Sequence, residues 1–348
     1  MLPDTDLLTK KKYLPLAEPA DSGCLNVVLH FMQKLPRTIA AIFTGLLFTV
    51  VISCGDKIKF GQWTVQNSST DNANLSWAKF TWANEILGGK SFKRTAMLIP
   101  LKIEGLPYDF LFQFDLGSNL TVLEGNPLKT ILEKHPEFDR MHRQVAFKDL
   151  TLFLGETKMT SRYCSVMPNQ GAPLAASSLT DNLPIRLGTI GADIFQNKIL
   201  VIDYPNQRFA VCDTLSGSFQ ATLTKITLDE LGRVLLPLRL NEKNYKVMFD
   251  NGASLFPLIM SDDKINDFST AASTDTITTS SWGTIHNVIG RPLKQEFQLA
   301  GQTFSNIIVY ADYRQDSRAD TYDASAGNAL FWNKTIVIDF KNQRFGVK

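Results

Sequence analysis

The chain has 348 residues and a formal net charge of +2, with 36 Lys and Arg against 34 Asp and Glu. This nearly equal number of positive and negative side chains predicts neither a basic surface for nucleic acid nor an acidic surface for cationic partners. Hydrophobic residues make up 44% of the chain and charged residues 20%, which excludes a disordered or collagen-like protein. The length fits two domains of ordinary size or one large β architecture. Four Cys are too few for a disulfide scaffold.

The N-terminal segment contains an uncharged apolar stretch at residues 39–52, preceded by Lys34 and Arg37. A membrane-spanning helix needs about 20 apolar residues, so this stretch is too short to span, but it has the length of a signal-peptide core. Met32 stands where such a signal begins. We therefore expect residues 1–53 to comprise an upstream extension and a signal peptide, with Met32 as the true start.

The apolar stretch ends in Val51-Ile52-Ser53-Cys54. A small residue followed by Cys, directly after an apolar core, resembles the lipobox of bacterial lipoproteins. The resemblance implies cleavage before Cys54, a lipid on its thiol, and a chain anchored at the bacterial cell envelope, in the periplasm or on the outer surface. An uncleaved anchor or a plain secretory signal is the alternative. Residues 54–94 are then expected to form a tether and an N-terminal element.

The rest of the chain repeats itself. The stretch that ends in Phe249-Asp250 repeats the one that ends in Phe114-Asp115, and GNALFWNKTIVIDFKNQRFGV near the C-terminus repeats GADIFQNKILVIDYPNQRFAV. Asp115 precedes Gly191 by 76 residues, and Asp250 precedes Gly327 by 77. Two spacings that agree to one residue indicate a duplication.

The duplication predicts two homologous lobes, at residues 95–213 and 232–348, joined by a linker at 214–231. Apolar and polar residues alternate in Leu101-Lys102-Ile103 and Leu238-Arg239-Leu240, as in half-buried strands. We therefore expect an all-β fold of two homologous lobes; the resemblance described below implies a cleft between them.

Each lobe is predicted to place an Asp at the end of an apolar strand, in Asp115-Leu116-Gly117 and Asp250-Asn251-Gly252. A buried carboxylate is costly unless it is hydrogen-bonded or functional, and Gly lets backbone amides approach it. Taken singly, both segments are ordinary turns. As equivalent points of a duplication, however, the two carboxyl groups would meet at a pseudo-twofold axis and share one proton. Such a pair can act as general acid and base in amide hydrolysis.

These segments resemble the aspartic peptidases, both pepsin-like and retropepsin-like. That family carries Asp-Thr/Ser-Gly-Ser/Ala/Thr after an apolar strand, and later a segment of two hydrophobic residues and Gly that packs beneath it. The chain offers Asp115–Asn119 with Thr189-Ile190-Gly191, and Asp250–Ser254 with Ser325-Ala326-Gly327. The resemblance covers residues 95–348.

The resemblance implies that a peptide or protein substrate is hydrolysed by an activated water, in a monomer without cofactor, metal or nucleic-acid partner. It implies catalytic roles for Asp115 and Asp250, and supporting roles in the loops for Gly117, Ser118, Gly252, Ala253, Gly191 and Gly327.

The chain also departs from the family pattern. The residue after each Asp is usually Thr or Ser, whose hydroxyl joins the two loops, but Leu116 has no hydroxyl and Asn251 has only its amide. Thr189 and Ala326 are imperfect for the usual large apolar residues, and no motif supports Tyr163 as the flap Tyr of pepsin-like enzymes. Two functions therefore stay open: an aspartic endopeptidase, and an inactive lipoprotein that binds peptides or proteins in the cleft between the lobes.

Other motifs are weaker. Gly88-Gly89-Lys90-Ser91 looks like the end of a phosphate loop, but Asn84 stands where that loop needs Gly. The four His show no metal-ligand spacing, and a nucleophile elbow of the GxSxG type is absent. Cys164 and Cys212 can either pair in an oxidising compartment or stay free, because the sequence does not place their Cβ atoms.

Overall fold

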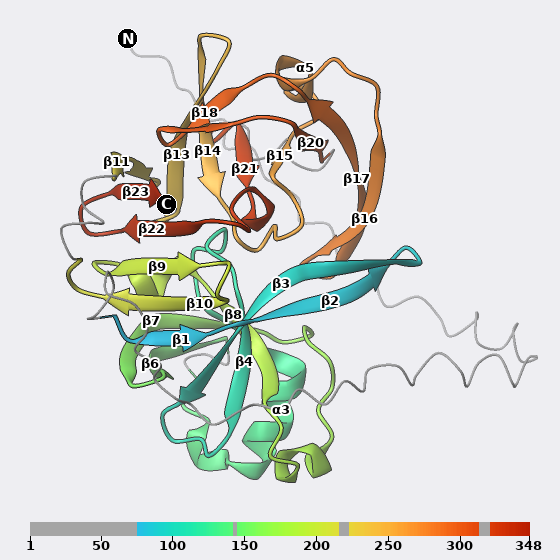
Figure 1. Ribbon diagram of the computed structural model, residues 1–348. Helices are drawn as coiled ribbons and strands as arrows, with labels where there is room; N and C mark the ends of the chain where they lie inside the picture. Colours follow the sequence, from blue (N-terminus) through green and yellow to red (C-terminus); the bar gives the residue numbers. More distant parts are fainter. Residues whose placement is uncertain (1–74, 142–144, 216–222, 313–320) are drawn as a thin grey trace, which may run out of the picture. The chain divides into compact units, whose positions relative to one another are not determined.

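The computed structural model describes residues 75–348, apart from 142–144, 216–222 and 313–320 (Figure 1). Met32, Cys54 and the predicted signal peptide lie outside the described residues. Every described residue belongs to one unit of the chain, residues 64–348. Within the described ranges, no helix has the length and apolar character needed to cross a membrane.

The structure is mostly β, as the sequence predicts, and its strands form three sheets. The seven-stranded sheet defines the N-terminal lobe, in the order β2-β3-β4-β8-β5-β7-β6. Its strands are β2 (Thr81–Leu87), β3 (Lys90–Ile103), β4 (Asp109–Phe114), β5 (Val122–Glu124), β6 (Ala146–Leu154), β7 (Thr157–Met167) and β8 (Ile185–Ile190). Helix α3 (Gly125–Lys134) and the 3-10 turns η1 (Pro136–Phe138) and η2 (Ala176–Thr180) complete this lobe.

The ten-stranded sheet defines the C-terminal lobe, in the order β16-β17-β20-β15-β21-β14-β13-β18-β19, with β12 paired to β13. Its strands are β12 (Thr227–Leu228), β13 (Val234–Leu240), β14 (Lys243–Phe249), β15 (Leu258–Met260), β16 (Asp275–Ser281), β17 (Thr284–Leu293), β18 (Phe297–Leu299), β19 (Gln302–Phe304), β20 (Ile307–Ala311) and β21 (Ala324–Ala326). The one-turn helix α5 (Ile265–Phe268) precedes β16.

A six-stranded sheet takes strands from both lobes, in the order β1-β10-β9-β22-β23-β11 (Figure 1). They are β1 (Trp77–Lys79), β9 (Ile199–Asp203), β10 (Arg208–Cys212), β11 (Thr224–Lys225), β22 (Thr335–Asp339) and β23 (Arg344–Val347), with the 3-10 turns η3 (Ala192–Phe195) and η5 (Asn328–Leu330) before β9 and β22. At its centre β9 and β22 are antiparallel and pair Val201 with Val337. Because these two Val are equivalent in the repeat, the sheet is symmetric about that pair.

The two lobes share the same arrangement around the Asp-bearing loops. Strand β4 lies parallel to β8, which is antiparallel to β5. Strand β14 likewise lies parallel to β21, which is antiparallel to β15. The ends of β4 and β14, which are followed directly by Asp115 and Asp250, therefore lie in equivalent surroundings in the two lobes.

One cluster of buried hydrophobic side chains extends through both lobes and holds these strand ends in place. Phe114, the last residue of β4, packs on Phe195 with ring centroids 5.2 Å apart. Phe249, the last residue of β14, packs on the equivalent Phe331 at 5.6 Å. Because large aromatic side chains contribute much of a core's stability, these ring pairs fix the residues that follow.

The expected domain boundaries do not coincide with the ends of the observed strands. The boundary at residue 95 falls inside β3, and the segment 54–94 contributes β1 and β2, which pair with β10 and β3. The segment 214–231 contributes β11 and β12, which pair with β23 and β13. A strand break at Phe80 and a bulge between Ala83 and Asn84 interrupt the alternation of inward and outward side chains, so residues 77–87 follow no single strand period.

Candidate active site

The two predicted catalytic residues occupy equivalent backbone positions. The N–H of Asp115 donates to the carbonyl oxygen of Ile190 at 3.0 Å, and the N–H of Asp250 donates to that of Ala326 at 2.9 Å. In both lobes the partner is the residue just before the Gly of the predicted hydrophobic-hydrophobic-Gly segment. Each loop is therefore tied to the strand beside it, β8 or β21, at the point where the Asp side chain leaves the backbone.

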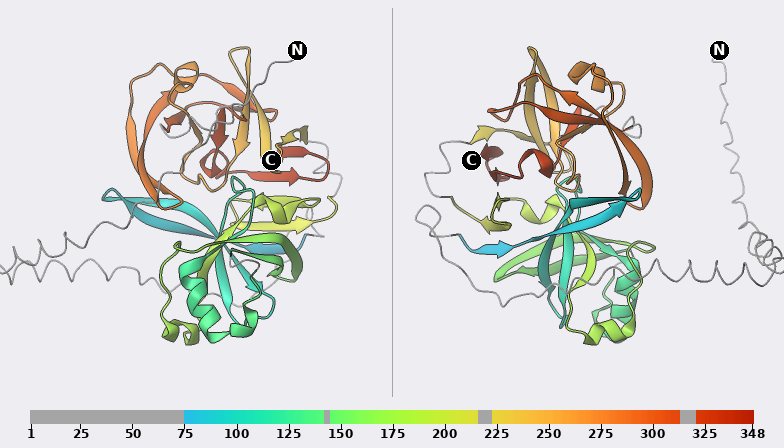
Figure 2. Two further views of the ribbon diagram at one scale, coloured as in Figure 1. Left: turned by 180° about the vertical axis from the view of Figure 1, so that it is seen from behind. Right: turned by 45° about the vertical axis from the view of Figure 1, so that its right-hand side comes forward.

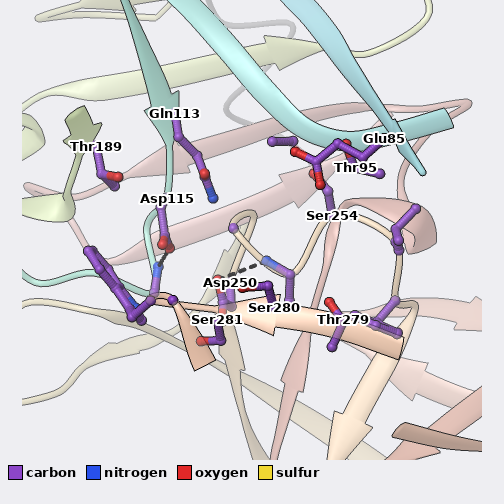
Figure 3. Close-up of a pocket in the computed structure, with 18 of the residues that line it drawn as sticks. Glu85, Thr95, Gln113, Asp115, Thr189, Asp250, Ser254, Thr279, Ser280 and Ser281 are labelled. Atoms are coloured by element: carbon purple, nitrogen blue, oxygen red, sulfur yellow. Dashed lines mark hydrogen bonds between the residues drawn. The ribbon is translucent and has the colours of Figure 1, made fainter. Parts of the chain in front are cut away.

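The structure brings the two carboxyl groups together (Figure 3). Asp115 is 8% exposed, and its Oδ1 accepts the N–H groups of Gly117 at 2.9 Å and Ser118 at 3.1 Å. Burial raises the pKa of Asp115 well above its ordinary value, and the charge of Asp250 and a hydrogen bond with it raise this pKa further. Two carboxyl groups in such contact titrate as a pair that holds one proton over a wide pH range.

Gly117 and Gly252 make room for this contact. A Cβ added at Gly117 would lie 2.5 Å from the carboxyl carbon of Asp250, and one added at Gly252 would collide with the carboxyl group of Asp115. Each Gly therefore accommodates the Asp of the opposite loop. From the sequence, Gly is expected at these positions only because it lets the amides of the same loop approach the carboxylate. The contact with the Asp of the opposite loop is a second reason for Gly.

The remaining loop residues that the sequence singles out lie directly around the pair. The Ser118 hydroxyl donates to the carbonyl oxygen of Leu120 at 2.7 Å, and the Ala253 N–H donates to Asp250 Oδ1 at 3.2 Å. A Cβ at Gly191 would collide with the backbone of Leu120, and one at Gly327 with the backbone of Ala253 and Phe256. Each of these two Gly thus packs against the backbone of the segment that follows the Asp of its own lobe.

A hydrogen bond joins the two loops across the pseudo-twofold axis. The N–H of Leu116 donates to Asn251 Oδ1 at 2.6 Å, and both residues are fully buried. Asn251 therefore takes the place of the hydroxyl that the resemblance leads one to expect. Its Nδ2 has no hydrogen-bond partner among the described residues.

Sequence reasoning did not identify the residues that support Asn251. Asn328, in η5, donates from Nδ2 to the Asn251 carbonyl oxygen at 2.7 Å and to Ser254 Oγ at 2.6 Å. The Tyr204 hydroxyl, from the end of β9, donates to Asn328 Oδ1 at 2.5 Å. Burial raises the pKa of Tyr204 well above its ordinary value, so the phenol stays protonated and remains a donor.

The first lobe has a different support at this point. Asp193, in η3, accepts the hydroxyl groups of Thr121 at 2.8 Å and Ser161 at 2.7 Å. The Thr121 Oγ1 in turn accepts the N–H of Gly191 at 3.3 Å. The only signal of this difference in the sequence is the pair of residues after each Gly, Ala-Asp in one copy and Asn-Ala in the other.

A cavity of about 490 Å³ lies above the two Asp and is lined by both lobes (Figure 3). Gln113, Thr189 and Arg186 line it from the N-terminal lobe, and Leu255 and Ile259 from the C-terminal lobe. Two hairpins complete its lining, β2–β3 and β16–β17, with the residues Glu85, Leu87, Thr95, Ala96, Thr279, Ser280, Ser281, Trp282, Gly283 and His286. This volume is in the range that ligand pockets usually have, about 300–1,000 Å³.

Each hairpin starts in one lobe and reaches the other (Figure 2). A Cβ at Gly88, in the turn of β2–β3, would lie 3.0 Å from Thr278 Oγ1 on β16. A Cβ at Gly283, in the turn of β16–β17, would lie 3.3 Å from Gln170 Nε2 of the N-terminal lobe. The two hairpins thus cross the cavity in opposite directions, and we call them the roof hairpins.

The segment Gly88–Ser91, which looks like the end of a phosphate loop in the sequence, belongs to the first roof hairpin. His286, on β17, lines the cavity and lies 3.4 Å from Asp312 through its Nε2. Within the parts of the chain that the structure describes, no group of three His, Cys, Asp or Glu is placed to hold a metal ion.

Five other residues, a Tyr, two Cys and two Asp, do not line the cavity. Tyr163 is 40% exposed on β7 and does not line it. Cys164 and Cys212 are both free, so the alternative in which they pair is wrong. Asp203 and Asp339 are the last residues of β9 and β22, and each accepts a hydrogen bond from the Asn three residues later, Asn206 or Asn342.

Comparison with known proteins finds no match in sequence but finds similar solved structures. No protein-family model matches the chain, and no curated protein matches it in sequence. Among solved structures, the chain is similar to the aspartic proteinase from Irpex lacteus, with 14% sequence identity and a TM-score of 0.43, over 78% of this chain and 96% of that one.

Proposed function

We propose that this protein is an aspartic-type endopeptidase, which hydrolyses peptide bonds with Asp115, Asp250 and a water molecule. One observation carries the proposal: two carboxyl groups from equivalent loops are in hydrogen-bond contact beneath a cavity lined by both lobes. Burying two acids in contact with each other lowers the stability of the fold, and residues with only a turn role do not need such a contact. Strongly perturbed acids in a cleft are typical of catalytic sites.

The proposed reaction uses one proton on the pair. Burial and the neighbouring charge raise the pKa of Asp115, so in the proposed reaction the proton is assigned to Asp115 and the negative charge to Asp250. Asp250 takes a proton from the water as its oxygen attacks the carbonyl carbon, and Asp115 donates its proton to the carbonyl oxygen. The resulting diol collapses when Asp250 gives its proton to the amide nitrogen, the C–N bond breaks, and Asp115 takes a proton from one diol hydroxyl. The products are a carboxylic acid and an amine, and the pair returns to its starting form with the proton on Asp115.

The roof hairpins support this chemistry. They cover the cavity from opposite lobes, and a covered site strengthens electrostatic interactions by excluding water. Their strands also lie beside the cavity, where a substrate in an extended conformation can pair with a β strand. The cavity lining is thus consistent with a peptide substrate.

The location of the enzyme is part of the proposal. The sequence supports a lipid on Cys54 and therefore an anchored monomer at the bacterial cell envelope, acting on peptides or proteins there. Purified membranes tested by intact mass should contain a chain that begins at lipidated Cys54. A mature N-terminus upstream of residue 54 would contradict the anchor without affecting the proposed catalytic pair.

A second function, peptide binding without turnover, is favoured by one specific observation. Leu116 is apolar and fully buried, so its side chain returns no hydrogen bond to the opposite loop. Loops joined in one direction only can hold the carboxyl groups less firmly, and a misplaced pair loses much of its catalytic power.

Cleavage of a mixed peptide library separates the two functions. The parent protein should cut library peptides at acidic pH, with a bell-shaped dependence of rate on pH, because the singly protonated pair is the active form. Asp115→Asn and Asp250→Asn should each lower kcat by about 10²–10⁴-fold or more while the circular dichroism stays unchanged. Absence of cleavage at every pH, with peptide binding equal in the parent and both Asn variants, would establish the binding protein instead.

A further inference from the structure

The cavity has two chemically different sides, although the lobes that form them are related by duplication. Gln113 and Met248 are equivalent, since each precedes its Asp by two residues and each pairs with the second residue before the loop Gly, Thr189 or Ser325. Gln113 lines the cavity, whereas Met248 is 1% exposed and packs with Leu235 and Tyr322. The same point of the fold is thus polar and open in one lobe, and apolar and filled in the other.

Gln113 belongs to a polar group that also contains Glu124 and Arg186. Arg186 donates from one terminal guanidinium nitrogen to Gln113 Oε1 at 3.2 Å, and its Nε lies 3.9 Å from Glu124 Oε1. All three residues line the cavity, and the side chain of Arg186 is 45% exposed. A guanidinium carries several N–H donors in a planar fork, so donors remain for a ligand after these contacts.

The C-terminal lobe adds an apolar part to the cavity lining, beside polar residues such as Ser254 and Ser280. Leu255, Phe256 and Ile259 line it from the loop after Asp250 and from β15. The polar group belongs to the N-terminal lobe and these apolar side chains belong to the C-terminal lobe. The residues on either side of a bond held above the pair would therefore meet different surroundings.

We propose that the polar group formed by Gln113, Glu124 and Arg186 selects a substrate with a side-chain amide, Gln or Asn, on one side of the bond to be cleaved, with an apolar residue on the other side. The proposal rests on the proposed peptidase function and specifies its substrate class. Arg186 and Glu124 neutralise each other, so the group as a whole carries no net charge.

A primary amide matches this group because it both donates and accepts. Its oxygen accepts from the Arg186 guanidinium, and its NH₂ donates to the carboxylate of Glu124 or to the amide oxygen of Gln113. A substrate carboxylate would face Glu124 and the exposed Glu85 nearby, and a substrate ammonium would face Arg186. An apolar side chain would leave these polar groups without partners when it displaced their water.

The test uses a peptide library in which the positions on both sides of the cleaved bond are randomised, with products identified by mass spectrometry. The parent should prefer Gln or Asn over Leu, Glu and Lys by about tenfold or more on one side only, as one or two hydrogen bonds of ordinary strength provide. The other side should prefer apolar residues.

Two charge-changing variants make the test independent of overall stability. In Glu124→Gln the guanidinium is no longer neutralised, so the preference should move toward Glu. In Arg186→Gln the carboxylate is no longer neutralised, so it should move toward Lys. The matched control is Arg162→Gln, on the exposed face of β7 and away from the cavity, which should keep the parent's preference.

The outcomes separate this inference from the proposed function. If the parent cleaves peptides but neither variant changes the preference, the selection is wrong and the peptidase function stands. If the parent cleaves nothing, the peptidase function fails, and capture of the same library on immobilised protein decides the selection. Enrichment of Gln and Asn peptides by the parent but not by the variants supports it, and equal capture overturns it.

Discussion

The N–H of Leu116 and the Oδ1 of Asn251, 2.6 Å apart, join the loop of one Asp to the loop of the other. The joint is unequal, because Asn251 contributes a side-chain acceptor while Leu116 contributes only its backbone. Asn251 is in turn held by Asn328, and Asn328 by Tyr204 from the opposite lobe. The geometry of the proposed catalytic pair therefore depends on a short series of hydrogen-bonded polar residues that ends at Tyr204, directly after β9.

Replacing Asn251 should weaken this joint. In Asn251→Ala the buried N–H of Leu116 loses its acceptor, which costs about 1–3 kcal/mol of the free energy of unfolding, and kcat should fall because the two loops are no longer tied. Urea denaturation and initial rates measure the two effects. The control Asn266→Ala changes an exposed Asn of α5 and should alter neither; equal effects of both substitutions would rule out a special role for Asn251.

Introducing a hydroxyl at position 116 should separate activity from stability. Leu116→Thr loses buried apolar volume and should lower the free energy of unfolding by about 0.5–3 kcal/mol. The new hydroxyl can donate across the axis, so kcat should stay unchanged or rise. A variant that remains folded in circular dichroism but loses turnover would show that Leu116 itself is needed.

A Cβ at Gly117 should disturb the pair more than the fold. In Gly117→Ala the methyl group would lie 2.5 Å from the carboxyl carbon of Asp250, so the Asp250 carboxylate has to move away from Asp115. We expect kcat to fall by about 10²-fold or more, since displacements of roughly 1 Å have effects of this size. Turnover equal to that of the parent would mean that the carboxyl groups tolerate separation.

The raised pKa of Asp115 predicts how stability depends on pH. Because its folded pKa lies above the unfolded value of about 3.9, the folded state binds the proton more tightly. The stabilisation by this proton is complete below the unfolded pKa and is lost as pH rises through the folded pKa.

The variant Asp115→Asn cannot ionise and escapes this loss. It should therefore be more stable than the parent at neutral pH, and the difference should shrink as the pH falls below the unfolded pKa of about 3.9, where the parent is protonated in both states. Urea denaturation of both proteins at several pH values measures the difference. A difference that does not vary with pH would contradict the raised pKa.

The sequence predicts much of the pair and little of what covers it. The repeat locates Asp115 and Asp250 because equivalent positions of a duplication must have equivalent backbones, and the two Gly segments follow for the same reason. The hairpin β16–β17 has no counterpart at the equivalent point of the N-terminal lobe, where helix α3 follows β5 directly. Comparing the two copies therefore gives no signal for Trp282 or His286, which come near the pair only through long-range strand pairing.

Side-chain roles in the loops were also beyond the sequence. An Asn after the Asp can bond through either end of its amide, and only the register of the two loops determines that Oδ1 meets the Leu116 N–H. Likewise, nothing local to Tyr204 indicates that its hydroxyl reaches η5 of the other lobe.

The symmetric pairing of β9 with β22 has a consequence for how such a molecule can diversify. The edges of β9 and β22 are equivalent and pair with each other. Two separate copies of one lobe could associate through the same edge. In such an association every mutation appears on both sides of the axis. When one gene encodes both copies, Gln113 can be polar while Met248 stays apolar, so each side of the cavity is open to selection on its own.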